Sequence, residues 1–473
     1  MALGRRRTVQ QSLFVTRDEI AEAPAHPFYS RLEAVMKQSD FDAFCEEICR
    51  PYYADRIGRP GLAPGVYFRL LMLGYFERIP SERQIAWRVA DSLSLRNFIG
   101  LDLATATPDH STISKTRRRL PLSVHLAVFG KVHEILVSNG LLRGKKLGVD
   151  ATTLVANASM RALTHNISGK SYREYVKGLM AEDPNEPGDP TPEDISRFDR
   201  RRKGKKLSNK HWRNPHNPDA KIAKMKDGRT HFSEKCEHAV DLETGAVVAV
   251  TVQGADLGDT TTMDVTLAAV AENLQNVEQA LQAQRGAQPR RAGRPPRRDT
   301  IQHCVADKGY HSAPVCERLQ EQGIEPVISE PKGGRRKWKG KRRQQAAFYR
   351  NRANIRSEQG KQWMRQRAER VERAFAHYLD DGGMRRLWLK GHENILKRLL
   401  IQVAGFNLGL VMRKLFGAAT PRAMAARLGA CILAIWGLIR HLIAFERRFT
   451  RTCAIFVFDR PAPDSTQDLL PAT

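Results

Sequence analysis

A short apolar run that ends on a carboxylate is the feature that most restricts how this chain can fold. Residues 147–149 are Leu-Gly-Val, and they lead directly into Asp150, an alanine and two threonines. Such a run, bounded by charged and turn residues, predicts a buried strand. Because burying an unpaired charge is costly, Asp150 should have a cation beside it at the strand end. The alternative is an ordinary loop aspartate that makes a turn.

A second segment repeats this arrangement. Residues 301–306 form a short, partly apolar run, and Asp307 follows it. Further along, residues 367–375 have the pattern of a helix and carry Glu369 and Glu372. Two aspartates at strand ends and a glutamate on a helix supply the oxygen ligands that a pair of Mg²⁺ ions needs for phosphoryl transfer. The sequence therefore predicts a metal-dependent phosphoryl-transfer site.

Three motifs carry a resemblance to a known family: Asp150-Ala-Thr-Thr, Ala306-Asp307-Lys-Gly-Tyr-His and Val371-Glu372-Arg-Ala-Phe. From about residue 27 to residue 416 the chain resembles the bacterial insertion-sequence transposases of the DDE class. The resemblance implies an α/β fold, with an RNase H-like mixed sheet flanked by helices, an N-terminal all-helical domain and basic insertions. It also implies DNA cleavage and strand transfer, with Asp150, Asp307 and Glu372 as catalytic ligands of two Mg²⁺ ions, for which Mn²⁺ can substitute.

The choice between the two glutamates depends on the resemblance. Glu369 and Glu372 both flank the apolar stripe of the predicted helix, so spacing does not separate them. The family's glutamate follows a valine and precedes an aromatic residue by three positions, which favours Glu372. Arg367 corresponds to the family's upstream arginine at a looser spacing. The family's downstream lysine is replaced by Leu379, which leaves open whether this copy is active.

The charge balance indicates a polyanionic partner. The 473 residues include 78 Lys and Arg against 51 Asp and Glu, a net charge of +27. This excess favours nucleic acid over membrane. The 7 cysteines form no disulfide framework or zinc motif, and no secretory signal is visible, so we expect a reducing cytoplasm. The resemblance implies that the protein is bacterial and associated with the nucleoid. Residues 428–438 are too short to span a membrane and predict a buried or amphipathic helix.

The length predicts two or three domains. We expect a flexible N-terminus at residues 1–26, a helical DNA-binding domain at 27–142, a catalytic domain at 143–416 and a C-terminal helix and tail at 417–473. Basic insertions are expected near residues 160–230 and 330–355. After the first aspartate strand, hydrophobic periodicity and turn residues predict a hairpin at 237–252, helices at 260–284, 313–322 and 392–416, and a strand at 326–328.

Two short capped helices lie in the helical region. Ser81 begins a capping box, and Asp109 caps a helix that ends in Arg117, Arg118 and Arg119. A pair of short helices with a basic second member is typical of helix-turn-helix modules, so these arginines are predicted to contact DNA. The alternative is an ordinary helical bundle with solvated arginines.

Three strongly basic segments interrupt the predicted catalytic domain. Residues 197–210, which precede Trp212, and residues 332–343 combine cations with an aromatic side chain, a pattern that suits phosphate contact and base stacking. We expect both to contact DNA and to be poorly ordered without it. Residues 285–298 are rich in Pro and Gly and predict a solvated linker. The other predicted DNA-binding residues are Arg201, Arg202, Lys203, Lys205, Lys206, Trp212, Lys308, Arg335, Arg336, Lys337, Trp338 and Arg367.

The predicted partners are therefore DNA, as element ends and as target, and a second copy of the chain in the synaptic complex. Two rival functions use the same residues differently. A metal-dependent nuclease would need the carboxylates without a domain specific for element ends. An inactive or domesticated DNA-binding derivative would need only the cations. Metal-dependent cleavage tests the second rival, and strand joining separates a transposase from the first.

Overall fold

The computed structural model describes residues 26–54, 61–102, 105–183, 189–205, 207–225, 228–284, 301–333 and 336–458, with side chains up to residue 444. The chain forms two compact units, Met1–Ala419 and Thr420–Thr473. The expectations for residues 1–25 and 285–298, and for Lys206 and Arg335, lie outside the described residues.

The first part of unit one is helical, as the sequence predicts. Local capping sets two of the helix starts: the hydroxyl of Ser81 accepts the Gln84 N–H at 3.3 Å, and Asp109 accepts the Ser111 N–H at 2.8 Å. The third helix is apolar on every side because it is buried on every side. The elements are α1 (Pro27–Gln38), α2 (Phe41–Cys49), η2 (Arg50–Tyr52), α3 (Pro64–Phe76), α4 (Glu82–Ala90), α5 (Leu93–Phe98), α6 (His110–Arg119) and α7 (Leu122–Ser138).

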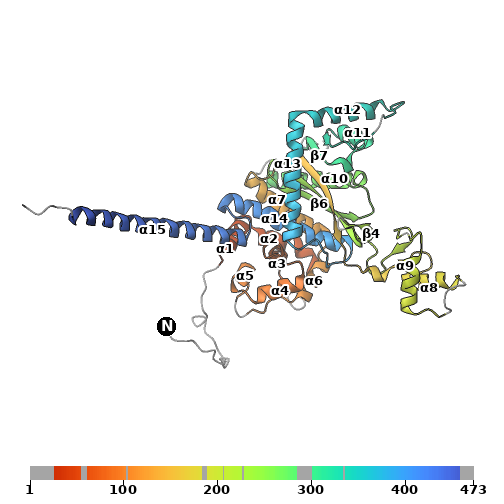
Figure 1. Ribbon diagram of the computed structural model, residues 1–473, viewed down its shortest axis with the longest axis horizontal. Coiled ribbons are helices and arrows are strands. Elements are labelled where there is room, and N and C mark those ends of the chain that lie inside the picture. Colours follow the sequence, from red (N-terminus) through yellow and green to blue (C-terminus); the bar gives the residue numbers. More distant parts are fainter. Residues whose placement is uncertain are drawn as a thin grey trace, which may run out of the picture. The chain divides into compact units, whose positions relative to one another are not determined.

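A mixed sheet follows (Figure 1). Its strands are β1 (Lys146–Val155), β4 (Lys221–Lys224), β5 (Thr230–Asp241), β6 (Val247–Gly254), β7 (His303–Ala306) and β8 (Glu325–Ile328). They are ordered β4-β5-β1-β7-β8, and β6 also pairs with β5. β1 runs antiparallel to β5 and parallel to β7, and β7 runs parallel to β8. The predicted hairpin and the two aspartate-bearing strands thus belong to one sheet.

Helices cover both faces of this sheet. Successive residues of a strand point to opposite faces, so Glu237 and His238 of β5 mark the two sides. The ring of His238 stacks on Phe375 at 3.6 Å, whereas Glu237 accepts a hydrogen bond from Thr262 at 2.5 Å. Phe375 belongs to α13 (Glu358–Phe375) and Thr262 to α10 (Asp259–Gln284), so these helices lie on opposite faces. The predicted RNase H-like α/β fold is confirmed.

The helical part and the sheet share one core. The helix α14 (His392–Phe416) packs against α3, α7 and β6. Its Arg398 is fully buried and donates to the carbonyls of Leu71 at 2.9 Å and Ile79 at 3.3 Å. Burial lowers the pKa of Arg398 to about 10. Since these carbonyls belong to the helical part, α14 joins the helices to the sheet. The other elements are α11 (Ala313–Glu321), α12 (Arg342–Arg356) and a π-helical turn, Ala376–Asp381.

The first basic insertion is folded, contrary to our expectation. It contains η3 (Met160–Ala162), β2 (Thr164–His165), α8 (Tyr172–Ala181), α9 (Pro192–Arg201) and β3 (Trp212–Arg213), which together we call the lobe. Its small core is formed by Val176, Met180 and Ile195. These apolar residues lie mostly outside the run of cations, and they supply the buried surface that the run itself lacks. The third basic segment likewise leads into α12.

Unit two contains α15 (Pro421–Phe458), 38 residues long. The predicted helix is present, but it is longer than expected, and the expectation that it is buried was wrong. Arg440 does not end the helix, and the apolar side chains are exposed, Leu433 by 73% and Trp436 by 62%. Among the described residues, one helical stretch, His392–Ala444, is long and apolar enough to cross a membrane by length and composition, and 6% of its most apolar window is buried.

Candidate active site

Asp150 of β1 and Asp307, which directly follows β7, fall at matching positions when the register of these neighbouring parallel strands is continued. In the ladder between β1 and β7, Gly148 pairs with Val305. Two residues further along each strand come the two aspartates, so their backbones are separated by roughly one interstrand spacing, about 4.8 Å. The sequence separates these residues widely, and the parallel register brings them together.

Asp150 has the counter-charge that its position in a strand requires. Arg367 Nη2 lies 2.9 Å from Asp150 Oδ2, and the Ala151 N–H donates to Oδ1 at 2.8 Å. Burial raises the pKa of Asp150 to about 6. The guanidinium of Arg367 and the amide oppose this rise, and the negative charges of Asp307 and Asp259 add to it. Arg367 was predicted to bind DNA, but it is 7% exposed and contacts the carboxylate instead.

Asp307 begins the turn that follows β7. Its Oδ1 accepts the Gly309 N–H at 2.9 Å, and the adjacent Lys308 is exposed. Tyr310 and His311, the last two residues of the motif around Asp307, are buried, with exposures of 0% and 8%. Burial and the nearby carboxylates raise the pKa of Tyr310 strongly.

Asp259 is a third aspartate at this site, and the sequence did not reveal it. It starts α10, and its Oδ1 lies 2.6 Å from the Nζ of the buried Lys235. Its Oδ2 and the Oδ1 of Asp307 both face Gly309, at the position where a side chain would begin. An aspartate before a run of threonines is typical of a helix N-cap, so its position in the sequence gave no sign that it meets two strand ends.

Glu372 is exposed on the side of α13 that faces the strand ends. It shares a row along the helix with Ala368 and Met364. Met364 Sδ lies 4.0 Å from the hydroxyl of Ser329, which directly follows β8. Glu369 is exposed elsewhere on the helix and forms an ion pair with Arg373 at 2.6 Å. This geometry favours Glu372 over Glu369 as a ligand.

The donor set fits a hard divalent cation in part. Two carboxylates on adjacent strands offer the oxygen ligands that Mg²⁺ and Mn²⁺ prefer. Within the described ranges, no three His, Cys, Asp or Glu side chains are grouped closely enough to hold a metal ion. A three-carboxylate site that included Glu372 would require its side chain to move closer to the two aspartates. Leu379, at the family's lysine position, is fully buried in the π-helical turn and belongs to the core.

The three arginines at the end of α6 differ in their surroundings. Arg117 is 6% exposed, forms an ion pair with Glu82 of α4 and lies 3.4 Å from Asn394 Oδ1 of α14. The prediction that Arg117 contacts DNA is therefore corrected, because its guanidinium is used inside the protein. Arg118 and Arg119 are exposed, and Arg119 lies over the ring of Tyr53.

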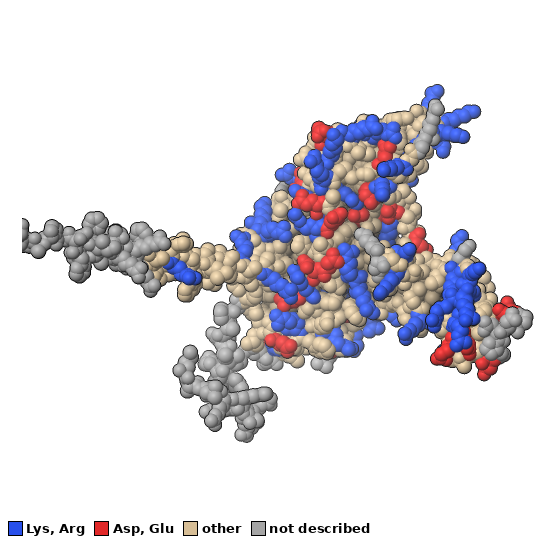
Figure 2. All heavy atoms as spheres, viewed as in Figure 1, with Lys and Arg blue, Asp and Glu red and all other residues tan. Residues whose placement is uncertain are grey.

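The lobe presents cations but not its tryptophan. Trp212 is 5% exposed and packs against Tyr172 and Tyr175, so the prediction that it stacks on a base is wrong. Arg202 is held by Asp199, 3.2 Å away. Figure 2 shows Lys and Arg side chains gathered on the lobe over α8 and α9. Arg201, Lys203 and Lys205 are exposed there, and Lys205 Nζ lies 3.4 Å from Asp199.

The segment before α12 keeps its cations accessible. Arg336 and Lys337 are exposed, and Arg336 lies 4.3 Å from the centre of the Phe348 ring. Trp338 is half-buried, with its ring 5.2 Å from that of Phe348. Arg336 and Trp338 line a cavity of about 330 Å³.

A sheet with aspartates at the ends of neighbouring parallel strands, covered by helices, defines the RNase H-like class of nucleic-acid-cleaving domains. Two family models match the chain: Transposase domain (DUF772) at residues 17–119 and Transposase DDE domain at residues 209–408. The chain belongs to the insertion-sequence DDE transposases. No curated protein and no solved structure matches it. Its function is DNA transposition, DNA is its partner, and the family uses divalent metal ions.

Proposed function

We propose that the chain binds the terminal inverted repeats of its insertion sequence and catalyses metal-dependent cleavage and strand transfer at Asp150, Asp307 and Glu372. The observation that carries this proposal is the level placement of the two aspartates on β1 and β7. The position of Glu372 around α13 directs a third carboxylate toward the same edge of the sheet, where the alternation of strand residues places the two aspartates.

The chain's own side chains prepare this chemistry. Asp150 and Asp307 would jointly hold one divalent ion, and Glu372 would complete the site of the second. The bound ions supply the positive charge that acidifies an attacking water and stabilises the leaving oxygen. Arg367 fixes the orientation of the Asp150 carboxylate. Water attacks the phosphodiester at the element's end, and the freed 3′-hydroxyl then attacks target DNA at the same site.

Exposed cations distributed over the unit would hold the DNA. Arg118 and Arg119 of α6, and Arg336 and Lys337 before α12, are exposed and form no ion pair with a described acid. We infer that two copies of the chain act together, each holding one end of the element. We also infer that the protein acts on nucleoid DNA in the bacterial cytoplasm.

The test is Mg²⁺-dependent nicking of DNA that carries the element's end. Asp150→Ala, Asp307→Ala and Glu372→Ala should each abolish nicking and strand transfer. End binding should persist in all three, because cations elsewhere provide it. The same result is expected in Mn²⁺. Joining of the nicked strand to a target plasmid separates a transposase from a nuclease.

Glu369→Ala is the matched control, because it removes a carboxylate from the same helix three residues away. It should retain activity, since Glu369 forms an ion pair with Arg373 and is not expected to bind a metal ion. Nicking that survives in Asp307→Ala would overturn the proposed site. Nicking that is lost in Glu369→Ala and kept in Glu372→Ala would reverse the choice of glutamate.

A further inference from the structure

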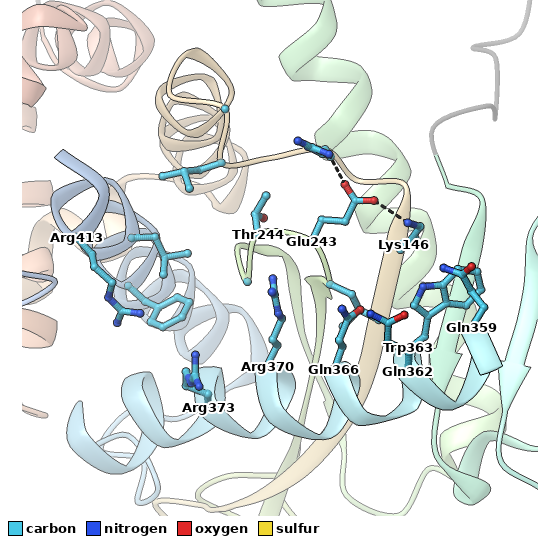
Figure 3. Close-up of a pocket in the computed structure, with 17 residues that line it drawn as sticks. Lys146, Glu243, Thr244, Gln359, Gln362, Trp363, Gln366, Arg370, Arg373 and Arg413 are labelled. Atoms are coloured by element: carbon cyan, nitrogen blue, oxygen red, sulfur yellow. Dashed lines mark hydrogen bonds and ion pairs between the residues drawn. The ribbon is translucent and has the colours of Figure 1, made fainter. Parts of the chain in front are cut away.

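A second surface of α13 carries charge that the proposed metal site does not use. A recess of about 580 Å³ lies between this helix, the turn that joins β5 to β6, the start of β1 and α14 (Figure 3). Gln366 and Arg370 point from α13 toward that turn, and Arg413 approaches from α14. We call this recess the cationic groove.

The groove has an excess of positive charge. Five cations line it, Arg143, Lys146, Arg370, Arg373 and Arg413, against one acid, Glu243. Glu243 is already paired with Arg143 and with Lys146, each at 2.9 Å. Among the described acids, none forms an ion pair with Arg370 or Arg413. At Arg370 and Arg413 the described part of the chain therefore supplies no ion-paired acid.

Neutral donors fill the space between the cations. Gln359, Gln362 and Gln366 line the groove, and their side chains form no hydrogen bond with any described residue. Together with Arg370 and Arg373 they make a row spaced three or four residues apart along one face of α13. At 1.5 Å per residue the row is about 21 Å long. A single small anion cannot occupy such a length, whereas a nucleic-acid backbone can.

The groove and the proposed metal site are on different sides of α13. Arg370 and Glu372 are two residues apart, which places them about 200° apart around a helix of 3.6 residues per turn. A phosphate in the groove is therefore not the phosphate that is cut. Trp363 and Phe406 also line the groove. Arginine and glutamine side chains often contact phosphate oxygens, and such contacts carry no sequence information.

We propose that the cationic groove binds the phosphate backbone of duplex DNA, independently of its sequence and away from the scissile phosphate. The choice of DNA as the polyanion rests on the proposed function. The groove adds a second contact to the carboxylate site, so it can hold flanking or target duplex while the active site acts on the element's end.

The experiment measures binding of the full-length protein to a duplex without element sequence, in EDTA, over a salt series. Each phosphate contact contributes about 0.9 to the slope of log affinity against log salt. Arg370→Ala combined with Arg413→Ala should reduce the magnitude of that slope by about two, so that binding depends less on salt. Arg370→Lys with Arg413→Lys should restore it. Since no metal is present, this result is independent of whether the protein cuts DNA.

The control removes the same charge from ion-paired positions outside the groove. Arg318 pairs with Asp264 and Arg350 with Glu325, so Arg318→Ala with Arg350→Ala should leave the slope near that of the parent. Equal slopes for the groove variant and this control would overturn the proposal. A slope that falls for single strands and not for duplex would overturn it as well. If the double alanine variant has a lower melting temperature than the parent, Arg370→Gln with Arg413→Gln is used in its place.

Binding to element-end duplex and binding to unrelated duplex are compared to decide which DNA the groove contacts. A loss that is equal on element-end DNA and on unrelated DNA supports sequence-independent contact. A loss confined to element-end DNA would assign the groove to end recognition and refute the sequence-independent role. Nicking of a short end duplex, long enough only for the carboxylate site, should continue in the groove variant.

Discussion

Neighbouring arginines in α6 show how burial decides the role of a charge. Arg117 lies inside the protein against Glu82, whereas Arg118 faces solvent. A buried ion pair is destabilising to break because the remaining charge is left without a partner. A solvated arginine contributes little to folding and stays available for phosphate. The basic run was visible in the sequence, and this division within it was not.

We therefore expect Arg117→Ala to reduce stability and Arg118→Ala to reduce DNA binding. Arg117→Ala should lower the free energy of unfolding by about 3–5 kcal/mol, since it leaves the largely buried Glu82 side chain, 11% exposed, without its partner. Arg118→Ala should leave stability within about 0.5 kcal/mol and reduce the salt dependence of DNA binding. Chemical denaturation and a salt titration of DNA binding check the pair. Similar stability of the two variants would contradict the structural role of Arg117.

His133 gives a pH dependence of stability. It is fully buried, and burial lowers its pKa to about 4 from an ordinary 6.5. Below pH 6.5 the unfolded chain takes up a proton that the folded chain refuses, so stability is full above this pH and falls as the pH approaches 4. The shift corresponds to about 3 kcal/mol.

The check is the urea midpoint of unfolding, measured for the parent and for His133→Phe from about pH 7 down to about pH 4. This range covers the interval between the ordinary pKa of histidine and the lowered pKa of His133. The variant should lose less stability on acidification. The carbonyl of Val247, which His133 contacts at 3.1 Å, keeps its hydrogen bond from Asn407 at 2.8 Å. The exposed His216 provides the control, and His216→Gln should follow the parent.

At the scale of elements, the strand β1 and the helix α13 form the unit on which the site depends. A short apolar run before each aspartate was enough to predict two strand ends, because buried strands have that composition. The proximity of Asp259 could not be predicted, since it depends on where α10 begins relative to β7. The lobe was also missed, because apolar residues scattered between cations show no clear period. Long apolar helices such as α14 were predicted with their observed bounds.

Gly148 tests the contact between these two elements. A Cβ there would lie 2.7 Å from Leu242 Cδ2 and 2.8 Å from Val371 Cγ2. Gly148→Ala should force α13 away from the sheet and cost about 1–3 kcal/mol of stability. Because α13 carries Arg367 and Glu372, nicking should fall more than DNA affinity. Gly178→Ala, where a Cβ meets open space on α8, should leave both unchanged. Equal losses in the two variants would contradict this reading.

At the scale of the whole molecule, the chain consists of a compact first unit and a separate second one. Unit one holds the helical part, the sheet and the lobe; α14 joins the helical part and the sheet in one core, and the lobe has a small core of its own. Unit two is dominated by α15, whose described side chains expose leucine, isoleucine and tryptophan. Large exposed apolar surfaces favour association or aggregation in water.

A chain truncated after Ala419 should therefore fold and stay active. We expect its melting temperature to be within about 2 °C of the parent's, since a loss of 1 kcal/mol shifts a large domain by only a few degrees. Light scattering should show less self-association than for the full chain, because the exposed apolar helix is gone. A large fall in melting temperature, or loss of nicking, would show that unit two supports unit one.

The level placement of Asp150 and Asp307 also has a consequence for how such a gene can change. The two acids meet because of which residues lie opposite in β1 and β7, whatever the length of chain between them. Insertions such as the lobe can be gained or lost in the intervening loops without moving the acids apart. A deletion of one codon inside β1 would instead turn Asp150 to the opposite face of the sheet. Length variation should accordingly be common between the strands and absent within them.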